Sequence, residues 1–292
     1  MRVGVFELKE PLPDLHEPHA LVMLRPWIDV GNAGSLSFAL LEEYLHAHRL
    51  GGLAKPGTFF DFTRYRPMIE LIEGRRKIIV PNTIIKYAKS PGGNDFLLFH
   101  LLEPHMLGEL YADSVLKVLQ KFGVKRYCLV GSMYDAVPHT KPLMVTGNAS
   151  GVLEEESYKL GVRSSDYEGP TTIVILVSEE ALKCNIEVMS LIVHLPQYTR
   201  LEEDYAGILR LLEVICSLYQ LPMNLEEVRS KAEEQYRQLS SAMERDTVLK
   251  RIVEQLEAHY EARLSKERKE APKLAPEIEK FLHDLSHRFD SN

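Results

Sequence analysis

Residues 107–131, LGELYADSVLKVLQKFGVKRYCLVG, decide the fold class. The first half of this stretch places apolar residues on one face of a helix, and Gly123 is a typical residue to end it. An apolar run at residues 126–130 follows directly and predicts a strand that is covered on both faces. A helix followed by a buried strand is the unit of a largely parallel sheet. The stretch therefore predicts an α/β domain.

Further elements of the same kind extend this prediction in both directions. Leu36, Leu40 and Leu41 begin a helical pattern that runs to His48, and Gly51 and Gly52 are interpreted as its stop signals. Short apolar runs bounded by turn residues predict strands. These strand predictions cover residues 20–24, 58–62, 77–80, 96–102, 126–131, 171–178 and 188–195.

Composition narrows the class of protein. The chain has 292 residues, of which 45% are hydrophobic and 26% charged, as expected of a globular protein with a sizeable core. Its length fits two average domains or one large α/β domain with an appendage. The net charge of -7 and the lack of any run of like charges predict no nucleic-acid partner.

Localisation follows from three features of the sequence. Residues 1–11 mix charges among apolar residues, so no secretory signal is predicted. No apolar run reaches the length needed to cross a bilayer, so no membrane association is expected. Cys128, Cys184 and Cys216 lie far apart in apolar segments, which is typical of reduced thiols. We expect a cytoplasmic protein.

The chain changes character after residue 222. Leu221, Pro222 and Met223 interrupt the pattern, and 13 Lys and Arg with 15 Asp and Glu occupy the remaining 70 residues. We therefore divide the chain into an α/β domain, residues 1–222, and a charged helical extension, residues 223–292. Apolar stripes predict two helices at residues 225–243 and 249–264 and a short one at 278–289. These stripes pack either on the same chain or on a neighbouring subunit.

A glycine-rich turn follows the first core strand and opens the first long helix. Asp29, Gly31, Asn32 and Ser35 lie in it, where free backbone N–H groups and the helix dipole favour an anion. The turn matches no nucleotide-binding pattern. Two interpretations stay open: a bound anion or polar ligand, or a turn in which Asn32 or Ser35 caps the helix.

Residues 131–142, GSMYDAVPHTKP, leave the end of a predicted strand and carry several polar side chains. In an open α/β sheet such loops line the binding crevice. Asp135, His139 and Lys141 are therefore candidates for ligand binding or acid–base work. The prolines on either side indicate instead a rigid loop that makes structural or interface contacts, and we favour this second interpretation.

The sequence predicts neither a catalytic nucleophile nor a metal or other cofactor. It contains no GxSxG elbow and no HExxH or Cys/His ligand set. His194, within the last predicted strand, is interpreted as a histidine of the core or of a pocket edge.

Five segments in this order resemble the proteasome-assembly-chaperone-two (PAC2) family. The resemblance covers roughly residues 1–222. The segments are residues 27–33 (WIDVGNA), 61–67 (DFTRYRP, with Arg64), 103–105 (EPH), 137–142 (VPHTKP) and 193–198 (VHLPQY).

The resemblance implies a three-layer α/β/α sandwich similar to the phosphorylase/hydrolase-like fold. It also implies homo-oligomers, often trimers or tetramers, and a role as a proteasome-assembly chaperone. Some relatives dock on the proteasome through a C-terminal hydrophobic-tyrosine-any tripeptide. This chain ends in Phe289, Asp290, Ser291 and Asn292, so docking through that tripeptide is not expected.

Two functions are therefore expected as alternatives. The first is a non-enzymatic assembly chaperone or scaffold that acts on another protein complex. The second is an enzyme or binding protein for a small anionic or nucleoside-like ligand, with Gly31, Arg64, Asp135, His139 and His194 around one crevice. The second rests on analogy of fold.

Overall fold

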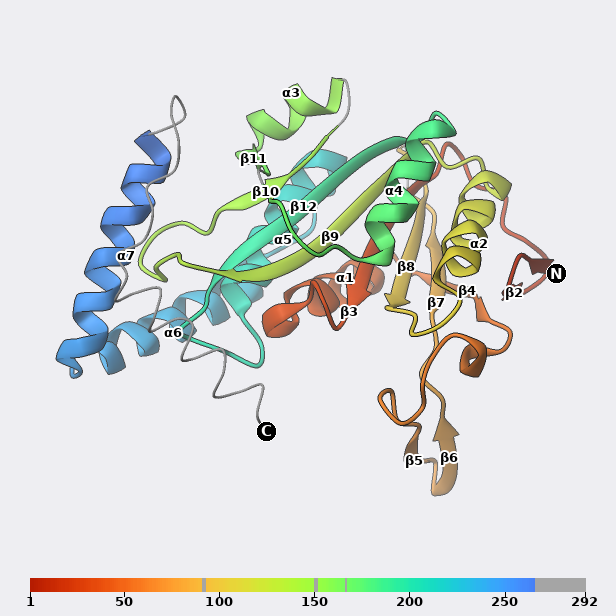
Figure 1. Ribbon diagram of the computed structural model, residues 1–292, viewed down its shortest axis with the longest axis horizontal. Helices are drawn as coiled ribbons and strands as arrows, with labels where there is room; N and C mark the ends of the chain where they lie inside the picture. Colours follow the sequence, from red (N-terminus) through yellow and green to blue (C-terminus); the bar gives the residue numbers. More distant parts are fainter. Residues whose placement is uncertain (91–92, 150–151, 166, 266–292) are drawn as a thin grey trace.

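A computed structural model describes residues 1–90, 93–149, 152–165 and 167–265. Over these residues the protein is an α/β structure, in which helices cover both faces of a large mixed β-sheet (Figure 1). The helices are α1 (Ala33–Tyr44), α2 (Gly108–Lys121), α3 (Val152–Lys159), α4 (Ile173–Lys183), α5 (Tyr205–Tyr219), α6 (Glu226–Met243) and α7 (Thr247–Ser265), with 3-10 turns at Val30–Asn32 and Pro56–Thr58.

The large sheet has the spatial order β1-β2-β4-β7-β8-β3-β9-β12-β10-β11. Its four central strands, β8, β3, β9 and β12, are parallel, and antiparallel strands flank them. Two further strands, β5 and β6, form a separate hairpin. The bounds are β1 (Arg2–Val3), β2 (Phe6–Leu8), β3 (His19–Arg25), β4 (His48–Leu53), β5 (Met68–Ile72), β6 (Arg75–Ile79), β7 (Ile84–Ala88), β8 (Phe96–Leu102), β9 (Arg126–Asp135), β10 (Val145–Gly147), β11 (Val162–Ser164) and β12 (Glu187–Pro196).

Each face of the sheet carries its own apolar core. Helices α2 and α4 cover one face, where Tyr111 and Val177 are fully buried. Helices α1 and α5 cover the other, where Phe38 and Leu211 are fully buried. The α/β class and the buried strands at residues 20–24, 96–102, 126–131 and 188–195 are therefore confirmed.

The strand predicted at residues 171–178 is wrong, because this segment begins helix α4. Its run of Ile and Val favours a strand by propensity. However, the buried residues Ile173, Val174, Val177 and Ala181 recur at helical spacing, so they pack on α2. Tertiary packing outweighs the local preference.

The glycines at 51 and 52 do not end the first helix, which stops at Tyr44. They lie in β4 instead. A Cβ atom on Gly51 would lie 2.3 Å from the carbonyl oxygen of Glu7 in the neighbouring strand. These positions are glycine because adjacent strands approach closely there, not because a helix ends.

The strand predicted at residues 58–62 is also wrong. Pro56 begins a 3-10 turn there, and irregular chain follows it. The apolar character of this run has another cause, since Phe59 and Phe60 are buried in the core beside Tyr111.

Helices α6 and α7 pack on their own chain. Helix α6 contacts α5, and α7 lies against the loop between β9 and β10 (Figure 1). The third helix predicted in the extension, residues 278–289, lies outside the described residues. No helix in the described ranges is long and apolar enough to cross a membrane.

Candidate functional site

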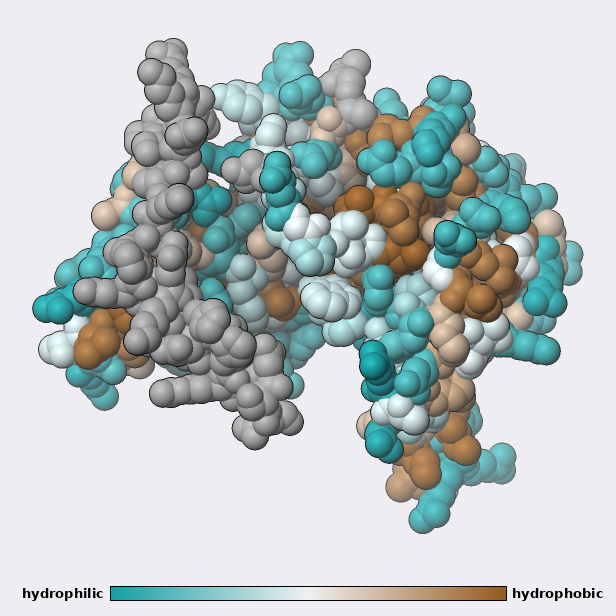
Figure 2. Space-filling model, viewed as in Figure 1, coloured by the Kyte–Doolittle hydropathy of each residue, from teal (hydrophilic) through white to brown (hydrophobic). Residues whose placement is uncertain are grey.

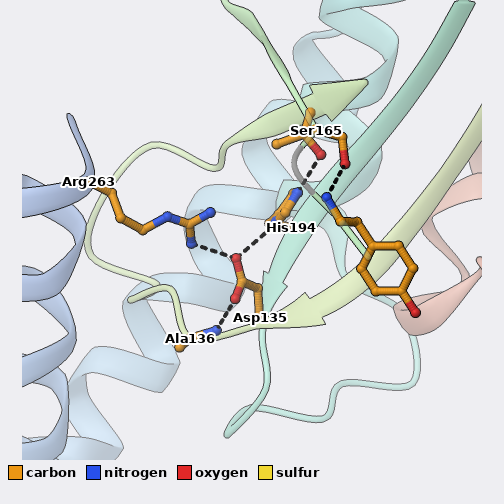
Figure 3. A network of polar contacts seen from close by, with 7 residues as sticks. Asp135, Ala136, Ser165, His194 and Arg263 are labelled. Atoms are coloured by element: carbon orange, nitrogen blue, oxygen red, sulfur yellow. Dashed lines mark hydrogen bonds and ion pairs between the residues drawn. The ribbon is translucent and has the colours of Figure 1, made fainter. Parts of the chain in front are cut away.

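A chain of hydrogen bonds joins three side chains from neighbouring strands at one end of the sheet (Figure 3). The Nδ1 atom of His194 donates to Oδ2 of Asp135 over 2.7 Å. On the other side of the ring, Nε2 forms a hydrogen bond with the hydroxyl of Thr146, also over 2.7 Å. The order of groups is therefore hydroxyl, imidazole and carboxylate.

Strand register creates this arrangement. Strand β12 pairs in parallel with β9, with His194 opposite Met133 and Pro196 opposite Asp135. On its other side β12 pairs with β10 through Val145. Because side chains alternate along a strand, alternate positions on three paired strands bring Asp135, His194 and Thr146 to the same face.

Helix α7 adds a cation to this network. Arg263 donates from Nη1 to Oδ2 of Asp135 over 2.7 Å, and the backbone N–H of Ala136 donates to Oδ1. Burial alone raises the pKa of Asp135, but the hydrogen bond and charge of His194, with those of Arg263, outweigh it and hold the pKa well below its usual range. The carboxylate is therefore ionised and fully engaged.

His139 belongs to a second polar network, which is closed by helix α6. The hydroxyl of Ser240 donates to the carbonyl of Tyr236, so it accepts from Nε2 of His139 at 3.0 Å. The Nδ1 atom then accepts the hydroxyl of Tyr198 at 2.6 Å. Burial lowers the pKa of His139, against a weaker effect of Glu257. This ring is neutral near pH 7 and has both nitrogens satisfied.

The β9–β10 loop is not an open surface loop, because α7 covers it. Lys141 pairs with Glu261 over 2.8 Å, and the hydroxyl of Tyr260 donates to the carbonyl of Pro142. Two small apolar clusters lie between helix and loop. They comprise Ala136 with Ile252 and Leu256, and Val137 and Met144 with Tyr260.

In the glycine-rich turn, the carboxylate of Asp29 lies where the sequence suggested a bound anion. The carboxylate of Asp29 accepts the backbone N–H of Ser35 over 2.9 Å and also binds its hydroxyl. The N-terminus of α1, where the sequence suggested an external anion, is thus occupied by an internal one. Gly31 has a φ of 59°, and Asn32 donates from Nδ2 to the carbonyl of Glu202.

The turn connects to the second network through Asp204. Its backbone N–H donates to the carbonyl of Gly31, and its carboxylate accepts the hydroxyl of Tyr236 over 3.0 Å. The ring of Tyr236 lies edge-on to His139. Burial raises the pKa of Asp204, while its hydrogen bonds oppose that rise.

Arg64 lies apart from these networks. It is exposed, faces Asp61 across 3.9 Å, and lines a cavity of about 860 Å³ with Trp27, Tyr65 and Glu103. The carboxylate of Glu103 caps helix α4 by accepting the N–H of Ile173. The expected crevice that joins Arg64 to Asp135 and His194 is therefore not formed.

The sequence analysis did not select Thr146, Tyr198, Ser240 or Arg263. Tyr198 ends the quoted segment VHLPQY, which also contains His194, so it could have been selected from the sequence. Thr146 is a lone hydroxyl in a three-residue strand. Arg263 is one of many charged residues in a helical region, and no local pattern marks it.

A hydroxyl, imidazole and carboxylate in this order is the arrangement that activates nucleophiles in hydrolases. Here, however, the Arg263 guanidinium also binds the carboxylate. That cation lowers the ability of Asp135 to stabilise a protonated imidazole. Within the described residues, no group of three or more His, Cys, Asp or Glu is arranged to hold a metal ion.

Comparison with known proteins identifies the family. The sequence model of the PAC2 family matches residues 23–243, most of the chain. The chain belongs to the PAC2 family. The match ends with helix α6, which the sequence analysis assigned to the extension. The division at residue 222 stays a prediction.

Solved structures of PAC2-like fold resemble this chain closely in shape. A protein of unknown function from Corynebacterium glutamicum superposes with a TM-score of 0.80 at 22% identity, covering 90% of this chain and 100% of its own. A proteasome-assembly chaperone homologue from Mycobacterium tuberculosis gives 0.70 at 23% identity, covering 80% and 99%.

A more distant PAC2-like structure comes from an archaeon. The proteasome activator PbaB of Pyrococcus furiosus gives a TM-score of 0.64 at 17% identity, covering 81% of this chain and 97% of its own. At these identities the likeness establishes the fold alone. A search of the curated proteins finds no match to this chain.

Proposed function

We propose that this PAC2 protein is a non-enzymatic assembly chaperone or scaffold, a homo-oligomer such as a trimer or tetramer, that acts on another protein complex. Two of its structural relatives are described as a proteasome-assembly chaperone homologue and a proteasome activator. Family membership and these relatives support a role exerted through protein–protein contacts.

One observation carries the proposal: reactive side chains are engaged inside the molecule while large apolar ones are exposed. Asp135, His139 and His194 are bonded internally. Trp27, in contrast, is 66% exposed beside the Arg64 cavity. Exposed tryptophans next to a hollow are typical anchors of protein interfaces. We propose this cavity as the contact for the partner complex.

The test uses the tagged full chain, expressed in its source cell, cross-linked and isolated. The matched control to Trp27→Ala is Tyr158→Ala, which removes an aromatic side chain of similar exposure, 69%, on α3. A chaperone recovers the subunits of one unfinished complex, with proteasome subunits as the first to examine. Trp27→Ala loses them and Tyr158→Ala retains them. Equal recovery with both variants contradicts the proposal.

The proposed compartment is the cytoplasm. Cys128, Cys184 and Cys216 are all free thiols, as is usual for proteins kept in a reducing environment. Fractionation of the source cell with an antibody to the chain tests this proposal.

A second candidate function is an enzyme or binding protein for a small anionic or nucleoside-like ligand. The hydrogen-bonded order of Thr146, His194 and Asp135 favours it. Nucleosides, phosphate and sugar phosphates are tested by thermal shift, because a ligand at 100 times its Kd stabilises by about 2.7 kcal/mol. The second function predicts a shift that His194→Ala abolishes. Absence of any shift removes this candidate.

A further inference from the structure

The β5–β6 hairpin projects from the body of the molecule (Figure 1). Its strands pair in register, with Glu70 opposite Lys77, and Glu73 and Gly74 form the turn with φ values of 52° and 73°. These values are typical of a tight two-residue hairpin turn. Within the described residues each strand pairs only with the other, so both outer edges are free.

Both faces of this hairpin carry exposed apolar side chains, among charged ones. Ile69, Leu71 and Ile78 share one face and are 68%, 74% and 69% exposed. Met68 and Ile79 are exposed on the other face. Figure 2 shows hydrophobic side chains along this projection. A lone two-stranded hairpin is only marginally stable in water, and an apolar free edge invites pairing.

The charges of the two edges differ in sign. Glu70 is the charged residue of β5, whereas β6 carries Arg75, Arg76 and Lys77. A two-fold antiparallel contact with full overlap would place Lys77 of one β6 opposite Lys77 of the other, or Glu70 of one β5 opposite Glu70 of the other. Pairing β5 of one copy with β6 of the next places Glu70 beside the cationic strand. Opposite charges across strands are favourable and like charges are not.

We propose that the hairpins of successive copies of this chain pair edge to edge, β5 against β6, and close into a ring. This inference rests on the proposed role as a homo-oligomeric scaffold and identifies the surface that assembles it. The contact is head-to-tail, which generates a closed ring when the rotation closes. The more apolar face, with Ile69, Leu71 and Ile78, turns toward the ring interior.

The occupant is a second copy because the two edges complement each other. Each hairpin offers one anionic and one cationic edge of equal length, five residues each. Within one hairpin, Glu70 lies opposite Lys77. If neighbouring hairpins lie side by side at the same height, Glu70 of one copy also lies opposite Lys77 of the next. Glu70 then meets a cation of the next copy, and Arg75 and Arg76 lie level with Ile72 and Leu71 rather than with another cation.

Light scattering of the full chain tests the charge argument. Glu70→Lys is expected to reduce the mass from that of a ring to that of a monomer, and exchange of both charges in Glu70→Lys with Lys77→Glu is expected to restore it. Glu73→Lys makes the same change of charge in the turn, outside the strands, and retains the ring. A monomeric native chain, or a ring that survives Glu70→Lys, overturns the proposal.

Cross-linking tests the direction of the contact. Glu70→Cys and Lys77→Cys are prepared separately in a Cys184→Ser background, since Cys184 is the partly exposed native thiol. Ring pairing predicts that a short thiol cross-linker joins subunits when the two variants are co-expressed, and that neither variant alone is joined. Self-linking of Glu70→Cys alone indicates a two-fold contact and overturns it.

These tests separate the inference from the proposed function. If the hairpin variants dissolve the ring but Trp27→Ala leaves partner recovery unchanged, the ring stands and the assigned partner contact is wrong. If partner recovery depends on Trp27 while the chain is monomeric, the chaperone role stands and the ring is wrong.

Discussion

Two regions of the molecule, the end of the sheet under α7 and the β5–β6 hairpin, depart from the usual rule that polar residues face solvent and apolar residues are buried. Under α7, the polar residues Asp135, His139 and Lys141 are held in internal contacts. In the hairpin, Ile69 and Leu71 face solvent. Polar residues are committed to the fold, and apolar residues are free for contact. The proposed interaction surfaces therefore lie away from the polar residues that the sequence marks as candidates for chemistry.

The largest expected loss of stability comes from removing the ion pair between Asp135 and Arg263 of helix α7. Asp135→Ala leaves Arg263 and His194 without their acceptor, and loss of one partner of a largely buried pair costs about 3 kcal/mol. The free energy of unfolding, measured in urea, is expected to fall by this amount. The control, Lys141→Ala, removes an exposed pair and changes it little. Equal small effects would show that the Asp135 network does not hold α7.

The next effect concerns the apolar contacts of the same helix. Leu256 is fully buried against Ala136, so Leu256→Ala is expected to cost about 2 kcal/mol. Val248 lies on the same helix and is exposed, and Val248→Ala is expected to stay within about 0.5 kcal/mol. Urea unfolding compares the two. If they agree, α7 is not packed on the domain.

Lowering the pH is expected to destabilise the interior, which contains a buried histidine, and not the hairpin, which contains no histidine. Burial, and then Arg126, lowers the pKa of His19 from 6.5 to about 4, and its buried Nδ1 has no hydrogen-bond partner among the described residues. Between these two values the unfolded chain binds a proton at His19 and the folded chain does not. The free energy of unfolding therefore falls as the pH decreases from 6.5 toward 4. His19→Phe is expected to lessen this fall. An unchanged pH profile would contradict the assignment.

The smallest expected effect is in the hairpin. Leu71→Ser removes an exposed apolar side chain with no core contact, so unfolding of the dilute, dissociated chain is expected to change by less than about 0.5 kcal/mol. Circular dichroism during urea unfolding measures it. A large loss in a monomeric sample would mean that the hairpin packs on its own domain.

The sequence predicted the fold where local pattern and packing agree. Helix α2 and strand β9 were located because Gly123 separates a helical stripe from an apolar run. Helix α4 was mistaken for a strand because Ile and Val dominate it, although its buried residues recur at helical spacing. Propensity was given more weight than periodicity there, and packing on α2 decides the structure.

The candidate site was predictable only in part. Asp135 and His139 were selected because they follow the end of a predicted strand, and His194 was interpreted as a histidine of the core or of a pocket edge. Their partners were not selected, since Thr146 and Arg263 approach from strands and helices far along the chain. The register of the strands and the packing of α7 on the β9–β10 loop determine these contacts, and no local sequence pattern predicts either. The strand predicted at residues 77–80 corresponds to β6 of the hairpin, but its exposure was not predictable, because an apolar run does not encode burial.

Amide hydrogen exchange at two protein concentrations tests the central contrast most directly. The account predicts that residues 68–79 are protected at high concentration and exchange quickly after dilution, because the next copy covers their free edges. Residues 136–144, covered by α7 of the same chain, exchange equally at both concentrations. Rapid exchange of the hairpin at every concentration, or concentration-dependent protection confined to the α7 end, would contradict the account.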